Sequence, residues 1–278
     1  MPIPHSAFPI PHSFLMCRPT YYTIAYEINP WMSLKRQVDG ARARLQWERL
    51  YSLLTRRLGV RVRCLPPQRG VPDLVFTANA GLVHGRTIIR SNFRHPERER
   101  EEPVIERYFK RSGFRVVHLN PRYHFEGEGD ALWVDETLVF GFRFRSEAPI
   151  HEELARLLGR EVLPVELSDR RFYHLDTCFC PLDADTALWF PQAFDRYGRR
   201  VLERLVPHLV DVSEADAARF ACNAIPIGRA VVMQAGASAA LRRRMSHRRF
   251  EAHAVDLSEF LKAGGSAKCL VLRLSGHP

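Results

Sequence analysis

The chain has 278 residues, of which 46% are hydrophobic and 26% are charged. This is the composition of a folded globular protein, and it excludes a chain that is disordered throughout. No apolar run reaches the roughly 20 residues that a membrane-spanning helix needs, so we expect no membrane-embedded segment.

The formal net charge of +10 raises the question of a nucleic-acid partner. Only four of the 41 basic residues are lysines, so arginine is strongly preferred along the whole chain. The arginines form small scattered groups, such as Arg242 to Arg244, on segments with the pattern of helix surfaces. A nucleic-acid-binding protein more often gathers them on one stripe with exposed aromatic residues. We therefore interpret the charge as a solvated basic surface and expect no nucleic-acid partner.

Six cysteines occur at irregular spacings, which indicates free thiols in a reducing compartment rather than a disulfide framework. The first residues, MPIPHSAFPIPHSF, lack the cationic and apolar regions of a secretory signal. We expect residues 1–12 to form a flexible extension, with Met16 as an alternative start. These observations predict a cytoplasmic protein, and they leave open whether it forms an oligomer.

Short strands alternate with single helices along the whole chain. Turn residues and β-rich phrases place strands at 74–77, 81–83, 87–89, 114–117, 131–134, 137–140, 161–165, 173–181, 186–189, 209–212, 223–227, 230–233, 252–255 and 268–274. Helix-boundary residues place helices at 32–57, 96–111, 152–158, 194–205, 238–245 and 258–263. The unit strand–strand–helix–strand thus recurs about five times, with a period of about 50 residues.

A period of this length is typical of radial or stacked repeats. A doubly wound α/β sheet is the alternative, but it would have longer helices after each single strand and a glycine-rich phosphate loop. We therefore predict an α/β protein with a five-bladed α/β propeller of ββαβ repeats. No break in composition marks a linker, so residues 13–278 are expected to form a single catalytic domain.

Polar, reactive residues occur at one strand end in each repeat, where the central cavity of a propeller would lie. Cys269 follows two glycines closely, which would let the backbone approach a ligand. Alternation along 173–178 would place His174, Asp176 and Cys178 on one strand face. With the carboxylates of the phrase FEGEGD at 125–130, these residues supply the thiol, imidazole and acid that nucleophilic catalysis requires.

The same segment contains residue types that can bind metal ions. The spacing His174-x-x-x-Cys178-x-Cys180 differs from that of zinc sites, which usually contribute paired cysteines from turns. We therefore expect no metal and no other cofactor.

The phrases at 26–32, 72–83, 95–98, 125–132, 172–182 and 259–274 together resemble the guanidino-group-modifying enzymes of the pentein fold. These enzymes include arginine deiminases, dimethylarginine dimethylaminohydrolases, amidinotransferases and arginine dihydrolases. The similarity covers residues 14–274. It implies the same five-bladed propeller and a hydrolase whose substrate is a small guanidino compound, arginine or a methylated arginine.

The resemblance also implies roles for single residues. Cys269 matches the nucleophile, His174 the general acid/base and Glu126 the acid that orients the histidine. Glu128 is the alternative to Glu126, because this chain has one extra residue before Asp130. The residues implied to bind the substrate are Asn29, Asp73, Asn79, Arg98, Arg145 and Asp176. Among these, Asp176 would hold the guanidine nitrogens, while Arg98 and Arg145 would grip the α-carboxylate.

Asn79 departs from the aspartate that is typical of deiminases and dimethylaminohydrolases, and both Asn79 and Asn29 match the arginine dihydrolases. Aspartate only accepts hydrogen bonds, whereas asparagine donates and accepts and therefore also suits the neutral ureido group of citrulline. We predict an arginine dihydrolase that gives ornithine, ammonia and carbon dioxide by way of citrulline. The alternatives are an arginine deiminase or dimethylarginine dimethylaminohydrolase that stops at citrulline, and a non-catalytic propeller that binds a ligand or nucleic acid.

Overall fold

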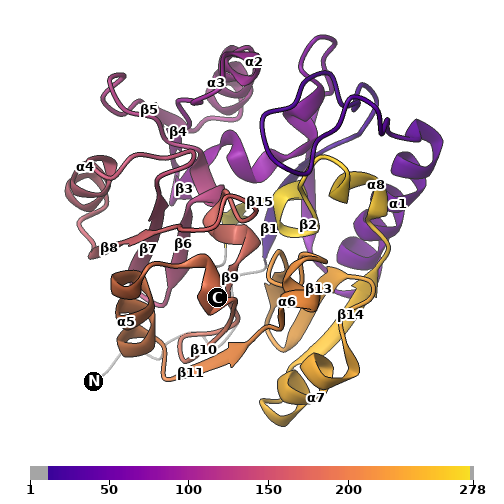
Figure 1. Ribbon diagram of the computed structural model, residues 1–278. Coiled ribbons are helices and arrows are strands. Elements are labelled where there is room, and N and C mark those ends of the chain that lie inside the picture. Colours follow the sequence, from indigo (N-terminus) through magenta and orange to yellow (C-terminus); the bar gives the residue numbers. More distant parts are fainter. Residues whose placement is uncertain (1–11, 276–278) are drawn as a thin grey trace, which may run out of the picture.

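The computed structural model describes residues 12–275, and its named strands form five separate three-stranded sheets. The sheets surround a common centre, and the longer helices lie on the outer rim (Figure 1). This arrangement confirms the five-bladed α/β propeller of ββαβ repeats. Of the extension expected at 1–12, residues 1–11 lie outside the described residues.

Each blade pairs its first two strands antiparallel and its last two parallel. Four blades are consecutive in the sequence: β3 (Gly81–His84), β4 (Thr87–Arg90) and β5 (Arg115–Val117); β6 (Ala131–Val134), β7 (Thr137–Phe142) and β8 (Val162–Glu166); β9 (Phe179–Pro181), β10 (Thr186–Trp189) and β11 (His208–Asp211); β12 (Ile225–Ile227), β13 (Ala230–Gln234) and β14 (Glu251–Val255). The fifth combines β15 (Leu272–Ser275), β1 (Ser13–Cys17) and β2 (Arg61–Leu65). Because β15 and β1 come from opposite ends of the chain, their pairing closes the ring.

One helix joins the second and third strands of each blade. These helices are α1 (Gly40–Ser52), which continues as the π-helical turn η1 (Leu53–Arg57), α3 (Glu102–Arg111), α4 (Ile150–Leu158), α5 (Arg196–Leu205) and α7 (Ala239–His247). Shorter helical segments are α2 (Pro96–Glu99), η6 (Pro191–Ala193), α6 (Glu214–Ala217) and α8 (Ser258–Leu261). In Figure 1 the five connecting helices cover the outside of the ring, so the centre is lined by strand ends and the turns before them.

Amphipathic faces hold the rim helices on the blades. The carboxylate of Asp39 accepts hydrogen bonds from two backbone N–H groups of the first turn of α1, which fixes where that helix begins. Ala43, Trp47 and Leu50 then recur at helical spacing and are fully buried in one hydrophobic cluster with residues of β1 and α8. Burial of this stripe stabilises the helix far more than its intrinsic propensity does.

Tight turns replace parts of three predicted strands. The strand predicted at 74–77 is wrong, because η2 (Pro72–Val75) and η3 (Thr77–Ala80) are 3-10 helices. Those predicted at 173–181 and 268–274 begin with the 3-10 turns η5 (Leu175–Thr177) and η7 (Lys268–Leu270), and η4 (Gly127–Gly129) precedes β6 in the same way. In η5 the N–H of Cys178 donates to the carbonyl of Leu175 at 3.1 Å, so the chain satisfies this group locally rather than in a β-ladder.

Two helices also differ from expectation. The helix predicted at 32–57 begins only at Gly40, after the Asp39 cap, and residues 18–39 form an irregular segment. The helix predicted at 96–111 is divided into α2 and α3 around Arg100. Pro103 lacks the N–H that would bond the carbonyl four residues earlier, which accounts for the interruption.

Candidate active site

The turns η3, η4, η5 and η7 contact one another at the centre of the ring and bring polar residues together. A narrow cavity lies there, and its polar lining consists of Asn29, Asp73, Asn79, Arg98, Arg145, Tyr173 and Cys269. Three further predicted residues adjoin this lining. Glu126 accepts a hydrogen bond from Arg145, and Asp176 accepts one from Cys269. His174 directly follows Tyr173 in the chain. The structure therefore gathers all nine predicted residues at a single site.

Cys269, the candidate nucleophile, lies in η7 and is only 3% exposed. Its thiol donates to Oδ2 of Asp176 at 3.3 Å and accepts from Nδ2 of Asn223 at 3.1 Å. Burial raises the pKa of the Cys269 thiol well above its usual range, and the negative charge of Asp176 raises it further. In the free protein this sulfur is therefore a neutral thiol that needs a positive charge nearby to ionise.

His174 and Glu126 form a buried imidazole–carboxylate pair. Nε2 of His174 lies 2.8 Å from Oε2 of Glu126, which also accepts a hydrogen bond from Nη1 of Arg145 at 3.0 Å. Burial alone would raise the pKa of Glu126, but Arg145 and the His174 hydrogen bond hold it well below its usual range. Glu126 is thus a fixed negative charge that sets the orientation of the imidazole.

Glu128, the alternative orienting acid, has a different partner. Its Oε2 accepts a hydrogen bond from Nζ of Lys268 at 2.8 Å and one from the backbone N–H of Arg273 at 3.2 Å. Glu128 therefore stabilises the turn η7, which carries Cys269. The geometry favours Glu126 over Glu128 as the partner of His174.

Asp176 follows His174 by two residues but not along a strand, because both belong to the turn η5 and its cap. The expectation that His174, Asp176 and Cys178 share one strand face is wrong. Cys178 lies in a hydrophobic core cluster, and its thiol contacts backbone carbonyls. Burial raises the pKa of Asp176 to about 6, against the opposing positive charge of Lys268. Oδ1 of Asp176 is buried and has no hydrogen-bond partner among residues 12–275, so it is available to a ligand.

The opposite wall of the cavity is built around Arg98. Its Nε and Nη2 donate to the two carboxylate oxygens of Glu101 at 2.8 and 2.9 Å, and its Nη1 donates to Oδ1 of Asn79 at 3.0 Å. Asn79 in turn donates through Nδ2 to the carbonyl of Glu126 at 3.2 Å. Asp73 accepts a hydrogen bond from Tyr26, and burial raises its pKa although Arg98 lowers it. Asn79 thus links the Arg98 wall to the His174–Glu126 pair.

Asn29 lies on the irregular segment that covers the cavity. Its side chain donates to the carbonyl of Ala263 at 3.0 Å and accepts from the N–H of Trp31 at 2.9 Å. Gly264 has a φ of +79°, and a Cβ there would come within 2.9 Å of Oδ1 of Asn29, so only glycine fits. Asn29 and Arg145 also line a wider entrance cavity outside the site, which gives a small molecule access from solvent.

Sequence reasoning missed several site residues. Asn223 was placed in a predicted strand at 223–227, but it lies before β12 and contacts Cys269. Glu101 and Tyr26 hydrogen-bond to Arg98 and Asp73, respectively. Tyr26 begins the phrase 26–32 of the resemblance but had no predicted role, and Glu101 lies outside every such phrase. The contacts of Asn223 with Cys269 and of Tyr26 with Asp73 join residues 46 and 47 positions apart, so no local signal marks them.

A buried thiol and an imidazole–carboxylate pair at the centre of a five-bladed ββαβ propeller define the pentein class of guanidino-modifying proteins. The family profile "N,N dimethylarginine dimethylhydrolase, eukaryotic" matches residues 20–275. The chain belongs to this family.

Curated relatives include two bifunctional arginine dihydrolase/ornithine cyclodeaminases. AgrE from Nostoc sp. is 46% identical over 94% of this chain and 38% of its own length. ArgZ from Synechocystis sp. is 43% identical over 94% of this chain and 37% of its own length. The N(G),N(G)-dimethylarginine dimethylaminohydrolase of Mycobacterium tuberculosis is 38% identical over 95% of this chain and 86% of its own. The chain therefore spans less than two fifths of the length of AgrE and ArgZ.

Among solved structures, the substrate-bound N-terminal domain of the cyanobacterial arginine dihydrolase ArgZ superposes with a TM-score of 0.91 at 42% identity. The match covers 96% of this chain and 99% of that domain. A dimethylarginine dimethylaminohydrolase structure superposes with a TM-score of 0.79 at 20% identity, which supports the shared fold alone.

No helix within residues 12–275 is both long and apolar enough to cross a membrane. Within the same residues, no group of three or more His, Cys, Asp or Glu side chains is arranged to hold a metal ion.

Proposed function

We propose that this chain is a cysteine-dependent hydrolase of the guanidine group and acts as an arginine dihydrolase. The observation that carries the proposal is the buried Cys269 thiol, held 3.3 Å from Asp176 in a cavity whose wall also presents Asn79. The similarity to the dihydrolase domains of AgrE and ArgZ supports this substrate.

The first hydrolysis begins when a guanidinium enters beside Asp176. Its positive charge stabilises the thiolate, so the Cys269 proton can pass to His174. The sulfur attacks the guanidinium carbon and forms a C–S bond, and the bond from that carbon to a terminal nitrogen breaks. His174 donates its proton to the leaving nitrogen, which departs as ammonia. Water deprotonated by His174 then adds to the adduct, the C–S bond breaks, and citrulline forms.

The second hydrolysis repeats these steps on the ureido carbon of citrulline. Cys269 expels a second ammonia and leaves a thiocarbamate, and water releases the carbamic acid of ornithine, which loses carbon dioxide. Because the ureido group is neutral, a site that retains it needs groups that both donate and accept. Asn79 and Asn29 supply such amides. Overall, arginine and two waters give ornithine, two ammonia and carbon dioxide.

The α-carboxylate end of the substrate requires a cation near the entrance. Arg145 lines both the inner cavity and the entrance cavity, and we assign it this role. Arg98, whose guanidinium is held by Glu101 and Asn79, lines the inner cavity but not the entrance cavity. Its role in binding the carboxylate stays a prediction, as do those of Asp73 and Asn29.

A second candidate is hydrolysis of dimethylarginine to citrulline and dimethylamine. The family profile and the 38% identity to the mycobacterial enzyme favour it. Incubation with arginine and, separately, with asymmetric dimethylarginine tests both functions when ammonia, dimethylamine, citrulline and ornithine are quantified. Two ammonia and one ornithine per arginine support the dihydrolase. Accumulation of citrulline from either substrate supports a single hydrolysis, and no turnover supports a non-catalytic binding propeller.

The Asn79→Asp variant is expected to shift the products from ornithine toward citrulline by about tenfold. A carboxylate at this position would keep the Arg98 hydrogen bond but lose the donor, so the neutral ureido group would be retained less well. The ratio of citrulline to ornithine, measured by chromatography after complete consumption of arginine, checks this. An unchanged ornithine yield would show that Asn79 does not decide the number of hydrolyses.

The pH dependence of kcat/KM for arginine is expected to follow the ionisation of the Asp176 carboxyl group. Its raised pKa, about 6, means that the carboxyl is neutral below pH 6 in the free protein. A neutral acid holds the always-charged guanidinium weakly, so kcat/KM for arginine is expected to fall about tenfold per pH unit below that value. Citrulline, which carries no charge on its ureido group, should show a shallower fall over the same range. Equal slopes for the two substrates between pH 4.5 and 7 would contradict this assignment.

We further propose that residues 13–278 act as one catalytic domain, because the β1–β15 pairing joins its ends into one ring. The six cysteines are free thiols, which supports a cytoplasmic location. The proposed partner is the small guanidino substrate.

A further inference from the structure

Asn223 is completely buried between the nucleophile turn η7 and Asp176. Its Oδ1 accepts the backbone N–H groups of Ser266 at 3.1 Å and Cys269 at 3.2 Å. Its Nδ2 donates to the carbonyl of Asp176 and to Sγ of Cys269, both at 3.1 Å. Its backbone carbonyl accepts the N–H of Lys268 at 3.2 Å. The side chain and the backbone carbonyl of Asn223 therefore contact two residues of the nucleophile turn, Lys268 and Cys269, and Ser266 just before it.

The orientation of this amide follows from its neighbours. Backbone N–H groups only donate, so the atom that faces Ser266 and Cys269 must be the oxygen. The nitrogen is thereby forced toward Sγ of Cys269 and the carbonyl of Asp176. Rotating the amide by 180° would set its N–H groups against two other donors and break four hydrogen bonds.

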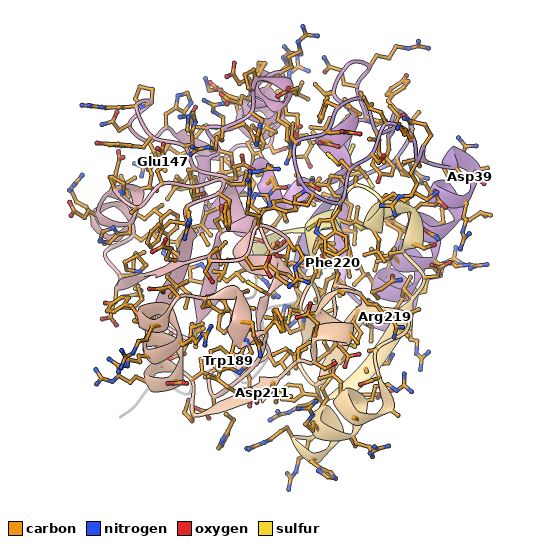
Figure 2. The ribbon with its side chains drawn as sticks, in the orientation of Figure 1. Asp39, Glu147, Trp189, Asp211, Arg219 and Phe220 are labelled. Atoms are coloured by element: carbon orange, nitrogen blue, oxygen red, sulfur yellow. The ribbon has the colours of Figure 1, made fainter. Side chains whose placement is uncertain are left out.

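The turn before Asn223 contains a residue in an unusual backbone conformation. Phe220 has a φ of +60°, a left-handed conformation that is rare for a bulky residue, and its carbonyl accepts the N–H of Asn223 at 3.0 Å. The Phe220 ring packs edge-on against Trp31 with ring centroids 4.9 Å apart. Figure 2 shows Phe220 toward the middle of the ring, whereas the adjacent Arg219 lies farther out. Strain of this kind persists where the surrounding packing enforces it, and it is concentrated at functional sites.

We infer that Asn223 is the positioning residue of the nucleophile: its Oδ1 fixes the backbone of the Cys269 turn, and its Nδ2 donates a hydrogen bond to the sulfur when it ionises. The inference rests on the proposed function, in which Cys269 attacks as a thiolate. A buried thiolate 3.3 Å from a carboxylate is electrostatically unfavourable, and hydrogen bonds to a charged acceptor are about twice as strong as neutral ones. The amide supplies this bond without adding a second charge.

The Asn223→Asp variant separates the two parts of this role. It keeps an oxygen for the backbone N–H groups of Ser266 and Cys269 but replaces the donor beside Sγ with an acceptor. The readout is the rate of alkylation of Cys269 by iodoacetamide against pH, followed by mass spectrometry of the peptide that contains Cys269. We expect the midpoint of this profile to rise by at least one pH unit. At a pH well below the midpoint, the fraction of Cys269 present as thiolate would then be at least about tenfold lower. On arginine, kcat should fall about 100-fold, with KM changed less than threefold.

Gln46→Glu is the matched control. Gln46 is also a buried amide whose oxygen accepts a backbone N–H, that of Glu259, and whose nitrogen donates to a side chain, that of Ser258. It lies outside the site, so the variant should lower the melting temperature without moving the alkylation profile of Cys269. Asn223→Ser, which has an acceptor oxygen but no amide, gives the same test if the aspartate variant does not fold.

The inference is overturned if Asn223→Asp leaves the alkylation midpoint and kcat at their wild-type values, or if Gln46→Glu moves the midpoint equally. Failure of the proposed function is distinguishable, because the wild-type protein would then lack turnover of arginine. The alkylation profile would still report whether Asn223 controls Cys269.

Discussion

Replacing Cys269 with serine is expected to lower the rate of arginine turnover by about 10⁴-fold or more. The proposed adduct requires a thiolate, and a serine hydroxyl in this buried place, beside the carboxylate of Asp176, would not ionise. Serine retains a donor for Asp176 and an acceptor for Asn223, so the cavity should keep its shape. Calorimetry should therefore show arginine binding with a Kd within about threefold of the wild-type KM.

The control is Cys178→Ser, a matched change at a buried thiol of the adjoining core. It is expected to cost stability, because it places a hydroxyl in an apolar cluster, while turnover persists. If Cys269→Ser retained more than 1% of the wild-type rate, the covalent mechanism would be wrong. If it bound no arginine, the loss of activity would reflect a damaged site.

The Glu126→Gln variant is expected to lower kcat by about 10³- to 10⁴-fold, with a smaller effect on KM. The carboxylate oxygen that contacts His174 also accepts a hydrogen bond from Arg145, so every group around it is a donor. A neutral amide would remove the charge that stabilises a protonated imidazole and would direct its NH₂ group at another donor. Losses of this size follow when the acid that orients a catalytic histidine is made neutral.

Glu128→Gln provides the comparison. Glu128 is also buried and also contacts a cation, Lys268, whereas the carboxylate that contacts His174 is that of Glu126. Both variants leave a cation with a weakened partner, so similar decreases in melting temperature are expected. The kcat of Glu128→Gln should nevertheless exceed that of Glu126→Gln by at least tenfold. Equal losses of kcat would mean that the two acids act together and that Glu126 is not specific to the histidine.

The sequence predicted the fold well because the fold is a repeat. Each ββαβ unit carries its own alternation of strand and helix signals, and the blade β6–β7–α4–β8 lies within two residues of its predicted bounds. Local patterns could not predict the 3-10 turns at the centre. Residues 74–77 have the β-rich composition of a strand. The chain nevertheless turns there and at 175–177, and these turns place Asp73, Asn79 and Asp176 at the site.

For the site, the sequence indicated which residue types were present, and the resemblance implied which of them act together. It did not decide between Glu126 and Glu128, since both are glutamates in one phrase of alternating glycines. The turn η4 and its cap direct Glu126 to His174 and Glu128, two positions later, to Lys268. Cys178 and Cys269 are likewise indistinguishable by composition, yet one lies in the core and the other lines the cavity.

The amino-acid sequence by itself determined the number of repeats, the order of strands and helices, and the basic, cysteine-containing character of this chain, because these depend on periodicity and composition. Only the tertiary structure decided the partners of the candidate catalytic groups. The Asn223–Cys269 and Glu128–Lys268 contacts join residues 46 and 140 positions apart. Closing the ring through β1 and β15 brings such segments to one centre, and hydrogen bonds across that centre then select one arrangement of otherwise equivalent side chains.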